Sequence, residues 1–273
     1  MAMWVDGAYV SETARLPVDR WTLQAHSSVA LSVCGTDVAV AQRPNDIDEA
    51  RTGVGALLWE GALIVLAFLI GNTRQGEDVR AALQAESAPA NGRGSKRRPQ
   101  ASKLSTPLRG VKCVELGAGT GLLAAALAAG GAEVVATDLD KVVPLMEENL
   151  SGVERCHVAA LPWGAQFDAE TDALCDRHRP SLVVVSDPVY QLPFVAPFLH
   201  TLRRMLDADP ARVGVVCFEM RAPEVAGALE AGLRDAFGAR LVEHRVSDAV
   251  EGYEDVDTDY VRLFVIRGTL RGG

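Results

Sequence analysis

The stretch VELGAGTG, residues 114–121, joins an apolar run to a run of small residues. The run VKCVELG that contains its start predicts a buried strand, and GLLAAALAAGG after it predicts a helix that ends at glycines. Gly117, Gly119 and Gly121 therefore lie at a strand-to-helix turn, where glycine permits a tight turn and a close approach of a ligand to the backbone. The spacing alone is a weak signal, because plain turns and dinucleotide sites share it.

Strands and helices alternate from this turn to the end of the chain. The expected strands cover residues 111–117, 132–140, 156–163, 181–187, 212–220, 239–247 and 260–268. The expected helices between them cover residues 141–152, 194–209 and 223–238. This alternation predicts an α/β fold, in which seven strands form a doubly wound parallel sheet with right-handed crossovers. No helical pattern separates the last two strands, so we expect the last strand to run antiparallel.

Three segments are expected along the chain. Residues 1–71 form an N-terminal extension, with a hairpin made by VALSVCG and TDVAVAQ and a helix around Trp59 that packs on the core. Residues 72–110 are polar and locally basic, which predicts a flexible insertion with only a possible helical turn at EDVRAALQAE. Residues 111–273 form the core.

The apolar run at residues 54–70 resembles a membrane span only at first sight. Glu60 interrupts it, and the uninterrupted part is short of the roughly 20 residues that a span requires. We expect a buried amphipathic helix and no membrane association.

Composition limits the classes of partner. The chain has 273 residues, 48% hydrophobic and 23% charged, which is typical of a soluble globular protein. Its net charge of -9 argues against a general nucleic-acid binder and fits a basic partner or a solvated acidic surface. The odd number of cysteines suits reduced thiols of an intracellular protein, with neither a disulfide framework nor a metal site.

The N-terminus has no signal-peptide pattern, so we expect a cytoplasmic protein. Lys96-Arg97-Arg98 leaves nuclear entry open, although three basic residues in a linker are more often simply solvated.

Several polar and aromatic side chains follow the expected strands. Asp138 ends the second strand, where it would accept hydrogen bonds from ribose hydroxyls or cap the next helix. The glycine turn and Asp138 together favour adenosine binding, and Leu122 replaces the third glycine usual in nicotinamide sites. Trp163 would flank an adenine or fill the core. Asp187, directly after the buried fourth strand, would by itself be a helix cap.

These motifs occur in the order of a known family. ELGAGTG, ATDLD, LPWG and SDPVY together resemble a class I, seven-strand S-adenosylmethionine-dependent methyltransferase. More narrowly, the chain is similar to the protein-lysine methyltransferases of the methyltransferase-like 21 group, of the type that methylates valosin-containing protein. That group carries a G-x-x-x-W element, matched by GALLW, a D-x-x-Y element, matched by Asp187 and Tyr190, and an E-x-R element, matched by Glu219 and Arg221. The resemblance covers roughly residues 22–268 without the insertion.

The resemblance implies a cofactor, a reaction and a site without a metal. The implied contacts with S-adenosylmethionine are Trp59, Glu115, Gly117, Ala118, Gly119, Gly121, Asp138, Trp163 and Ser186. Asp187 and Tyr190 are the implied catalytic residues, which we expect to orient a lysine amine rather than to act as a strong base. Methylation of a small amine, a non-catalytic cofactor-binding module and a nicotinamide oxidoreductase stay open as alternatives, the last disfavoured by Leu122.

The resemblance also implies a protein substrate, and we expect the enzyme to be a monomer. Residues 246–260 contain Asp248, Glu251, Glu254, Asp255, Asp257 and Asp259 with no basic residue. This run joins the last parallel strand to the antiparallel one, so it should emerge on the same side as Asp187. It is a solvated loop or, as we expect, a docking element for a basic segment around the target lysine.

Overall fold

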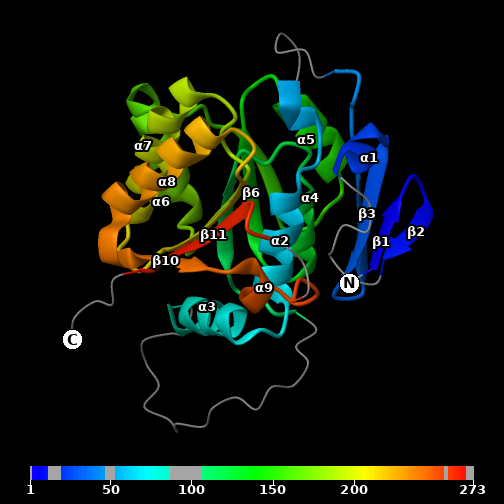
Figure 1. Cartoon of the computed structure of the whole chain (residues 1–273), viewed down its shortest axis with the longest axis horizontal. Helices are drawn as coiled ribbons and strands as arrows, with labels where there is room; N and C mark the ends of the chain where they lie inside the picture. The colour runs from blue at the N-terminus through cyan, green and yellow to red at the C-terminus, as the bar shows by residue number, and fades with distance from the viewer. Residues whose placement is uncertain (1, 12–19, 47–52, 87–105, 255–257, 269–273) are drawn as a thin grey trace, which may run out of the picture.

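A seven-stranded mixed sheet forms the centre of the molecule (Figure 1). The computed structural model describes residues 2–11, 20–46, 53–86, 106–254 and 258–268. The strands lie in the order β10 (Leu241–His244), β11 (Val261–Ile266), β9 (Val213–Glu219), β8 (Leu182–Ser186), β5 (Lys112–Leu116), β6 (Glu133–Asp138) and β7 (Cys156–Ala160). Neighbouring strands from β9 to β7 pair in parallel, and β11 is antiparallel to both β9 and β10. The predicted doubly wound sheet with an antiparallel last strand is confirmed.

The central strands are buried because helices cover both faces of the sheet. In β8, Val183 and Val185 pack on one face, and Leu182 and Val184 pack on the other, as the two-residue period of a strand requires. The helices α6 (Asp168–His178), α7 (Val195–Asp207) and α8 (Pro223–Phe237) cover the first face. The helices α2 (Glu60–Ile70), α4 (Leu122–Ala129) and α5 (Val143–Leu150) cover the second (Figure 1).

The N-terminal extension forms a second, four-stranded sheet in the order β2-β1-β3-β4. The expected hairpin is confirmed as β3 (Ser28–Val33) and β4 (Thr36–Ala41), joined by Cys34 and Gly35 with φ of 52° and 81°. Two left-handed residues give the turn that suits a two-residue hairpin loop. A further hairpin, β1 (Ala2–Val5) and β2 (Ala8–Ser11), was not predicted. The β4 strand packs on α4 and α5, so this sheet extends the helix layer outward.

The helix α2 is buried, as expected, but the prediction that it is amphipathic is wrong. Every residue from Glu60 to Leu69 is buried, because the central sheet, α4 and α3 surround it. Trp59 immediately precedes the helix as its N-cap residue. Among the described residues, no helix has both the length and the apolar character needed to cross a membrane.

Part of the expected flexible insertion is an ordered helix. The helix α3 (Arg74–Glu86) buries Val79 and Leu83 against the core, and Arg80 donates a hydrogen bond of 2.8 Å to the carbonyl oxygen of Leu69. The possible helical turn at residues 77–86 is confirmed as part of this longer helix, and the prediction of a flexible segment is wrong for residues 74–76. Two apolar positions four residues apart suffice to dock the helix. Residues 87–105, with Lys96-Arg97-Arg98, lie outside the described residues.

Candidate active site

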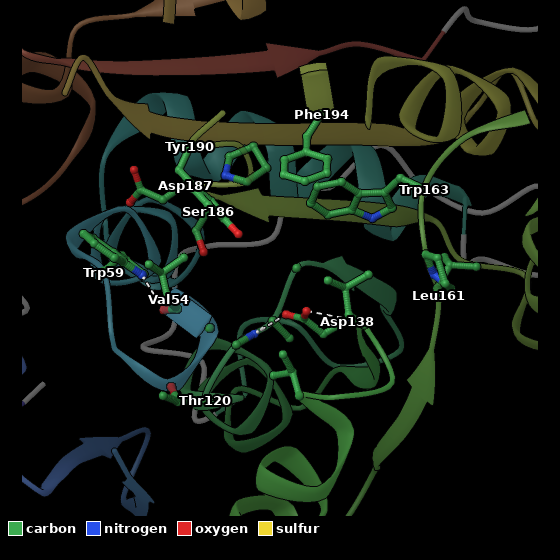
Figure 2. A pocket seen from close by; sticks show the side chains of 18 of the residues that line it. Val54, Trp59, Thr120, Asp138, Leu161, Trp163, Ser186, Asp187, Tyr190 and Phe194 are labelled. Carbon is green, nitrogen blue, oxygen red and sulfur yellow. Dashed lines mark hydrogen bonds between the residues drawn. The ribbon is translucent and has the colours of Figure 1, made fainter. Parts of the chain in front are cut away.

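A cavity of about 500 Å³ opens at the carboxyl ends of β5, β6 and β8 (Figure 2). Beside β5 the strand order reverses, because β6 and β7 are added on one side of it and β8 and β9 on the other. Such a point is the usual ligand site of an open α/β sheet, and the volume is typical of small-molecule sites. Most of the predicted site residues line it, namely Trp59, Gly117, Ala118, Gly119, Asp138, Trp163, Ser186, Asp187 and Tyr190. Figure 2 shows Asp138 on one side of this space and Trp59, Ser186 and Asp187 on the other.

The glycine turn forms one wall of the cavity because nothing larger than glycine fits there. Gly117 and Gly119 have φ of 74° and 56°, in the left-handed region that favours glycine. A Cβ atom on Gly117 would lie 3.2 Å from the ring of Trp163, and one on Gly119 would lie 3.0 Å from the carbonyl oxygen of Gly55. Gly55 belongs to the short 3-10 helix η1 (Gly53–Ala56), which we did not predict as part of the site.

Asp138 ends β6 and connects the glycine turn to the next segment. Its Oδ2 accepts a hydrogen bond of 2.8 Å from the amide of Gly119, and its Oδ1 accepts one of 2.7 Å from the amide of Leu139. Burial raises the pKa of the carboxyl group, and these two amides act in the opposite direction. A carboxylate has about four acceptor positions, so roughly two remain for the vicinal hydroxyls of a ribose. The site therefore fits an adenosine group.

Trp163 forms part of the cavity wall beside the glycine turn. Its ring packs edge-on against Phe198 at a centroid distance of 5.1 Å and lies beside Gly117. The indole Nε1 is buried and has no hydrogen-bond partner in the part of the chain that the structure describes. The packing of the ring against Phe198 therefore holds the indole in the cavity wall, although its buried N–H lacks an acceptor among the described residues, which is costly.

Asp187 is held by contacts with two other elements. Its Oδ2 accepts a hydrogen bond of 3.1 Å from the amide of Gly61 in α2, and its Oδ1 accepts one of 2.9 Å from the amide of Glu219 at the end of β9. The guanidinium of Arg221 lies 3.0 Å from the same Oδ1, and the Asp187 side chain is 5% exposed. Burial raises the pKa of Asp187, and the charge of Arg221 opposes the rise. Three of its roughly four acceptor positions are therefore in use. The backbone φ of 46° stores strain at this position.

Arg221 connects Asp187 to the aromatic wall of the cavity. Its Nε and Nη2 bind the two carboxylate oxygens of Glu219 at 2.8 and 2.9 Å. The same guanidinium lies 3.7 Å from the centroid of the Trp59 ring, a cation–π distance. The sequence identified the E-x-R pattern only as a family element. In the structure its arginine lies beside both Asp187 and Trp59.

Gly61 leaves no room for a side chain beside Asp187. A Cβ atom there would lie 2.5 Å from Asp187 Oδ2. Gly61→Ala should therefore displace the carboxylate and destabilise the protein by about 1–3 kcal/mol, measured by urea unfolding. Gly227→Ala in α8 is the matched control, because nothing lies within 4 Å of its Cβ position and it should stabilise by about 0.5–1 kcal/mol. Equal stabilities of the two variants would contradict the close contact.

Glu115 and Gly121 do not line the cavity, contrary to the expected direct contacts with the cofactor. Glu115 follows the same strand parity as Cys113, which places its side chain beneath α4, where the amide of Ala124 donates to it. Gly121 is the left-handed N-cap residue of α4, and its Cβ position lies 3.0 Å from Leu150. Both residues therefore stabilise the glycine turn from the side of α4 and do not face the cavity.

The buried Glu115 predicts a specific pH dependence. Burial, and then the charge of Asp138, raises the pKa of Glu115 well above its ordinary value. Its contribution to stability is therefore complete below the unfolded pKa of about 4.3 and is lost as the pH rises through the folded pKa. Glu115→Gln should gain on the wild type by about 1.4 kcal/mol for each pH unit between these two pKa values, measured by urea unfolding at a series of pH values. Parallel pH curves would contradict this assignment.

Two residues at the mouth of the cavity escaped prediction. Leu192 and Phe194 follow Tyr190 in the segment between β8 and α7, and all three side chains are 43–44% exposed. The rings of Tyr190 and Phe194 lie 6.0 Å apart. The apolar residues of the sequence VYQLPF, residues 189–194, could have indicated this exposed apolar segment.

The first part of the acidic run at 246–260, up to Glu251, does not lie beside Asp187, contrary to our expectation of an acidic rim there. The short helix α9 (Val246–Ala249) packs against α3 and β11, and Thr73, just after α2, donates a hydrogen bond of 2.8 Å to the carbonyl oxygen of Ala249. Glu251 accepts a hydrogen bond from the Asn72 amide at 3.4 Å, so it lies at the C-terminal end of α2, about 16 Å from Gly61 at its start. Tyr260 lies at the N-terminal end of α2, where it donates a hydrogen bond of 3.1 Å to Glu60, and Asp259 beside it is exposed. Asp255 and Asp257 lie outside the described residues.

The cavity contains no evident metal ligands. Within the described ranges, no three His, Cys, Asp or Glu side chains are grouped to hold a metal ion. The cysteines are free thiols.

Two comparisons with known proteins both find similarity to lysine methyltransferases. A family model described as lysine methyltransferase matches residues 45–227. EEF1A lysine methyltransferase 3 of Mus musculus is 30% identical over 236 residues, which cover 84% of this chain and 78% of the mouse protein.

Solved structures with a similar fold are more distant in sequence. A putative S-adenosylmethionine-dependent methyltransferase from Streptococcus mutans is 13% identical with a TM-score of 0.47, and the match covers 95% of this chain but only 58% of that one. A Thermus thermophilus 16S rRNA methyltransferase in complex with AdoMet and guanosine is 16% identical with a TM-score of 0.47, over 88% of this chain and 50% of that one.

Proposed function

Because the chain belongs to the lysine methyltransferase family, we propose that it methylates a lysine of a non-histone protein, with Asp187 and Tyr190 orienting the lysine amine. The protein is an S-adenosylmethionine-dependent protein-lysine methyltransferase of the methyltransferase-like 21 type. The observation that carries the assignment of roles is the position of Asp187, on the side of the cavity opposite Asp138 (Figure 2).

S-adenosylmethionine, when bound, supplies a methyl group on a positively charged sulfur that an amine lone pair can attack. The residues expected to hold it are Trp59, Gly117 to Gly119, Asp138, Trp163 and Ser186, which line the cavity together. Asp138 would bind the ribose hydroxyls, and Trp163 would lie against the adenine.

The target amine must lose its proton before it reacts. With a pKa of about 10.4, a lysine is neutral in about one molecule per 2,500 at pH 7. Asp187 is far too weak a base to remove this proton at equilibrium, and most of its acceptor positions are occupied. We therefore assign it to the alignment of the amine through its remaining acceptor position. Desolvation in the cavity disfavours the ammonium form, and alignment supplies most of the acceleration.

A protein substrate suits the mouth of the cavity better than a small amine does. Enclosure of a small amine requires a lid, whereas Tyr190 and Phe194 at the mouth are 43% and 44% exposed. The name of the mouse relative makes EEF1A the first protein to test. We further propose a cytoplasmic monomer, with nuclear entry as an additional possibility, that does not act on nucleic acid. A basic substrate segment remains a prediction from the net charge of -9.

Radiolabelled S-adenosylmethionine tests the proposal. The wild-type protein should label a protein in a cell extract, purified EEF1A being tried in parallel, and mass spectrometry should place the methyl group on a lysine. Asp187→Ala should label the same protein far more slowly. Labelling of small molecules alone would support the rival amine methyltransferase.

A further inference from the structure

Large apolar side chains are exposed almost entirely at one end of the described structure. They are Tyr9, Leu139, Tyr190, Leu192, Phe194 and Tyr260. All except Tyr9 either line the cavity, adjoin a residue that lines it, or lie beside Glu60 at the start of α2. Scattered exposed apolar residues are normal, but a contiguous group at the mouth of a cavity marks an interaction site.

The segment from Tyr190 to Phe194, which we call the apolar rim, is the centre of this group. It carries no charge from Pro188 to Val195. The 3-10 helix η3 (Leu192–Phe194) holds its second half, with the Phe194 amide donating a hydrogen bond of 3.1 Å to the carbonyl oxygen of Gln191. Pro188 and Pro193 restrict its backbone further. The rim therefore presents apolar side chains in a fixed arrangement, which lowers the entropy cost of binding.

The acidic side chains that adjoin Asp187 are buried or paired, and the exposed Asp259 beside Tyr260 adjoins Glu60 and not the rim. Asp187 and Glu219 are 5% and 1% exposed and both pair with Arg221, and Glu60 is 9% exposed. The acids around α9 lie at the far end of α2. The exposed surface next to Tyr190 at the cavity is therefore the apolar rim.

We propose that the apolar rim binds the substrate segment on either side of the target lysine, and that the residues next to this lysine are apolar. This inference rests on the proposed function. With the lysine side chain in the cavity, substrate residues within two positions of the lysine lie within about 8 Å of it along the backbone, at the mouth that Tyr190 and Phe194 line. The long-range charge of the protein would steer the encounter, and the rim would select the sequence.

Leu192→Ser tests the rim, because Leu192 is exposed and does not line the cavity. The substrate is the protein that the wild type labels in the extract. The variant should raise its KM by about fivefold or more with little change in kcat, the pattern of lost uniform binding. Its thermal shift with S-adenosylhomocysteine should be unchanged. Tyr9→Ser is the control, because Tyr9 is exposed in β2 at the edge of the N-terminal sheet and does not line the cavity, and it should leave KM and kcat as in the wild type.

The substrate provides a second measurement that does not depend on the folding of a variant. Serine is placed at the apolar residues that flank the labelled lysine, or at the basic ones, and the wild-type enzyme is assayed on each. A rise in KM only for the apolar replacements supports the proposal. An unchanged KM with Leu192→Ser, or a rise only for the basic replacements, would overturn it. If the wild type labels no protein at all, the proposed function itself fails. If it labels a protein but these KM values do not change as expected, only the proposal about the apolar rim fails.

Discussion

Asp187→Ala should lower turnover by roughly 100- to 1,000-fold, the loss typical of removing one preorganised polar group. It should also lower the free energy of unfolding by about 1–3 kcal/mol, because it leaves the amides of Gly61 and Glu219 without their acceptor, whereas Arg221 keeps its pairing with Glu219. Turnover with the labelled protein substrate and urea unfolding measure the two effects. Assays at a low temperature keep the variant folded.

Tyr190→Phe separates alignment from stability. Tyr190 is 43% exposed, so loss of its hydroxyl should reduce turnover and leave the melting temperature within the error of measurement. Both variants should retain most of the thermal shift produced by S-adenosylhomocysteine. A folded Asp187→Ala protein that methylates at the wild-type rate would reduce Asp187 to a structural anchor.

The central sheet was predictable because its strands are buried on both faces. In β8 and β9 the β-branched runs stand out as strands without reference to anything else. The helix α6 was missed because only Thr171, Leu174 and Cys175 are buried on it, too few for a recognisable period. The helix α2 was misjudged for the opposite reason, since periodicity cannot reveal a helix whose every face is apolar and covered.

The site was predictable to the extent that it depends on strand ends. Gly117, Asp138 and Ser186 come directly after or at the ends of adjacent parallel strands, so topology alone brings them together. The anchoring of Asp187 was not predictable, because Gly61 lies 126 residues away and the contact depends on how α2 packs. The position of the first part of the acidic run was missed similarly, since strand order places the ends of the run but not the packing of α9 against α3.

Asp138→Ala should weaken binding of S-adenosylhomocysteine by about 100-fold or more, because it removes two hydrogen bonds to a charged acceptor. It also releases the amide of Gly119 and so loosens the glycine turn. At a ligand concentration about 100 times the wild-type Kd, the wild type gains about 2.7 kcal/mol of stability, which the variant should almost entirely lose. Thermal unfolding with and without the ligand measures the difference.

Asp140→Ala is the matched control, because Asp140 is an exposed aspartate two positions away. It should keep the full thermal shift, and NAD should produce none with any of the proteins, since Leu122 replaces the third glycine of nicotinamide sites. Ribose hydroxyls donate to the ionised carboxylate, so wild-type affinity should fall as the pH is lowered through the raised pKa of Asp138. The Asp138→Ala variant should lack this fall. An unchanged shift in Asp138→Ala would mean that the ribose binds elsewhere in the cavity.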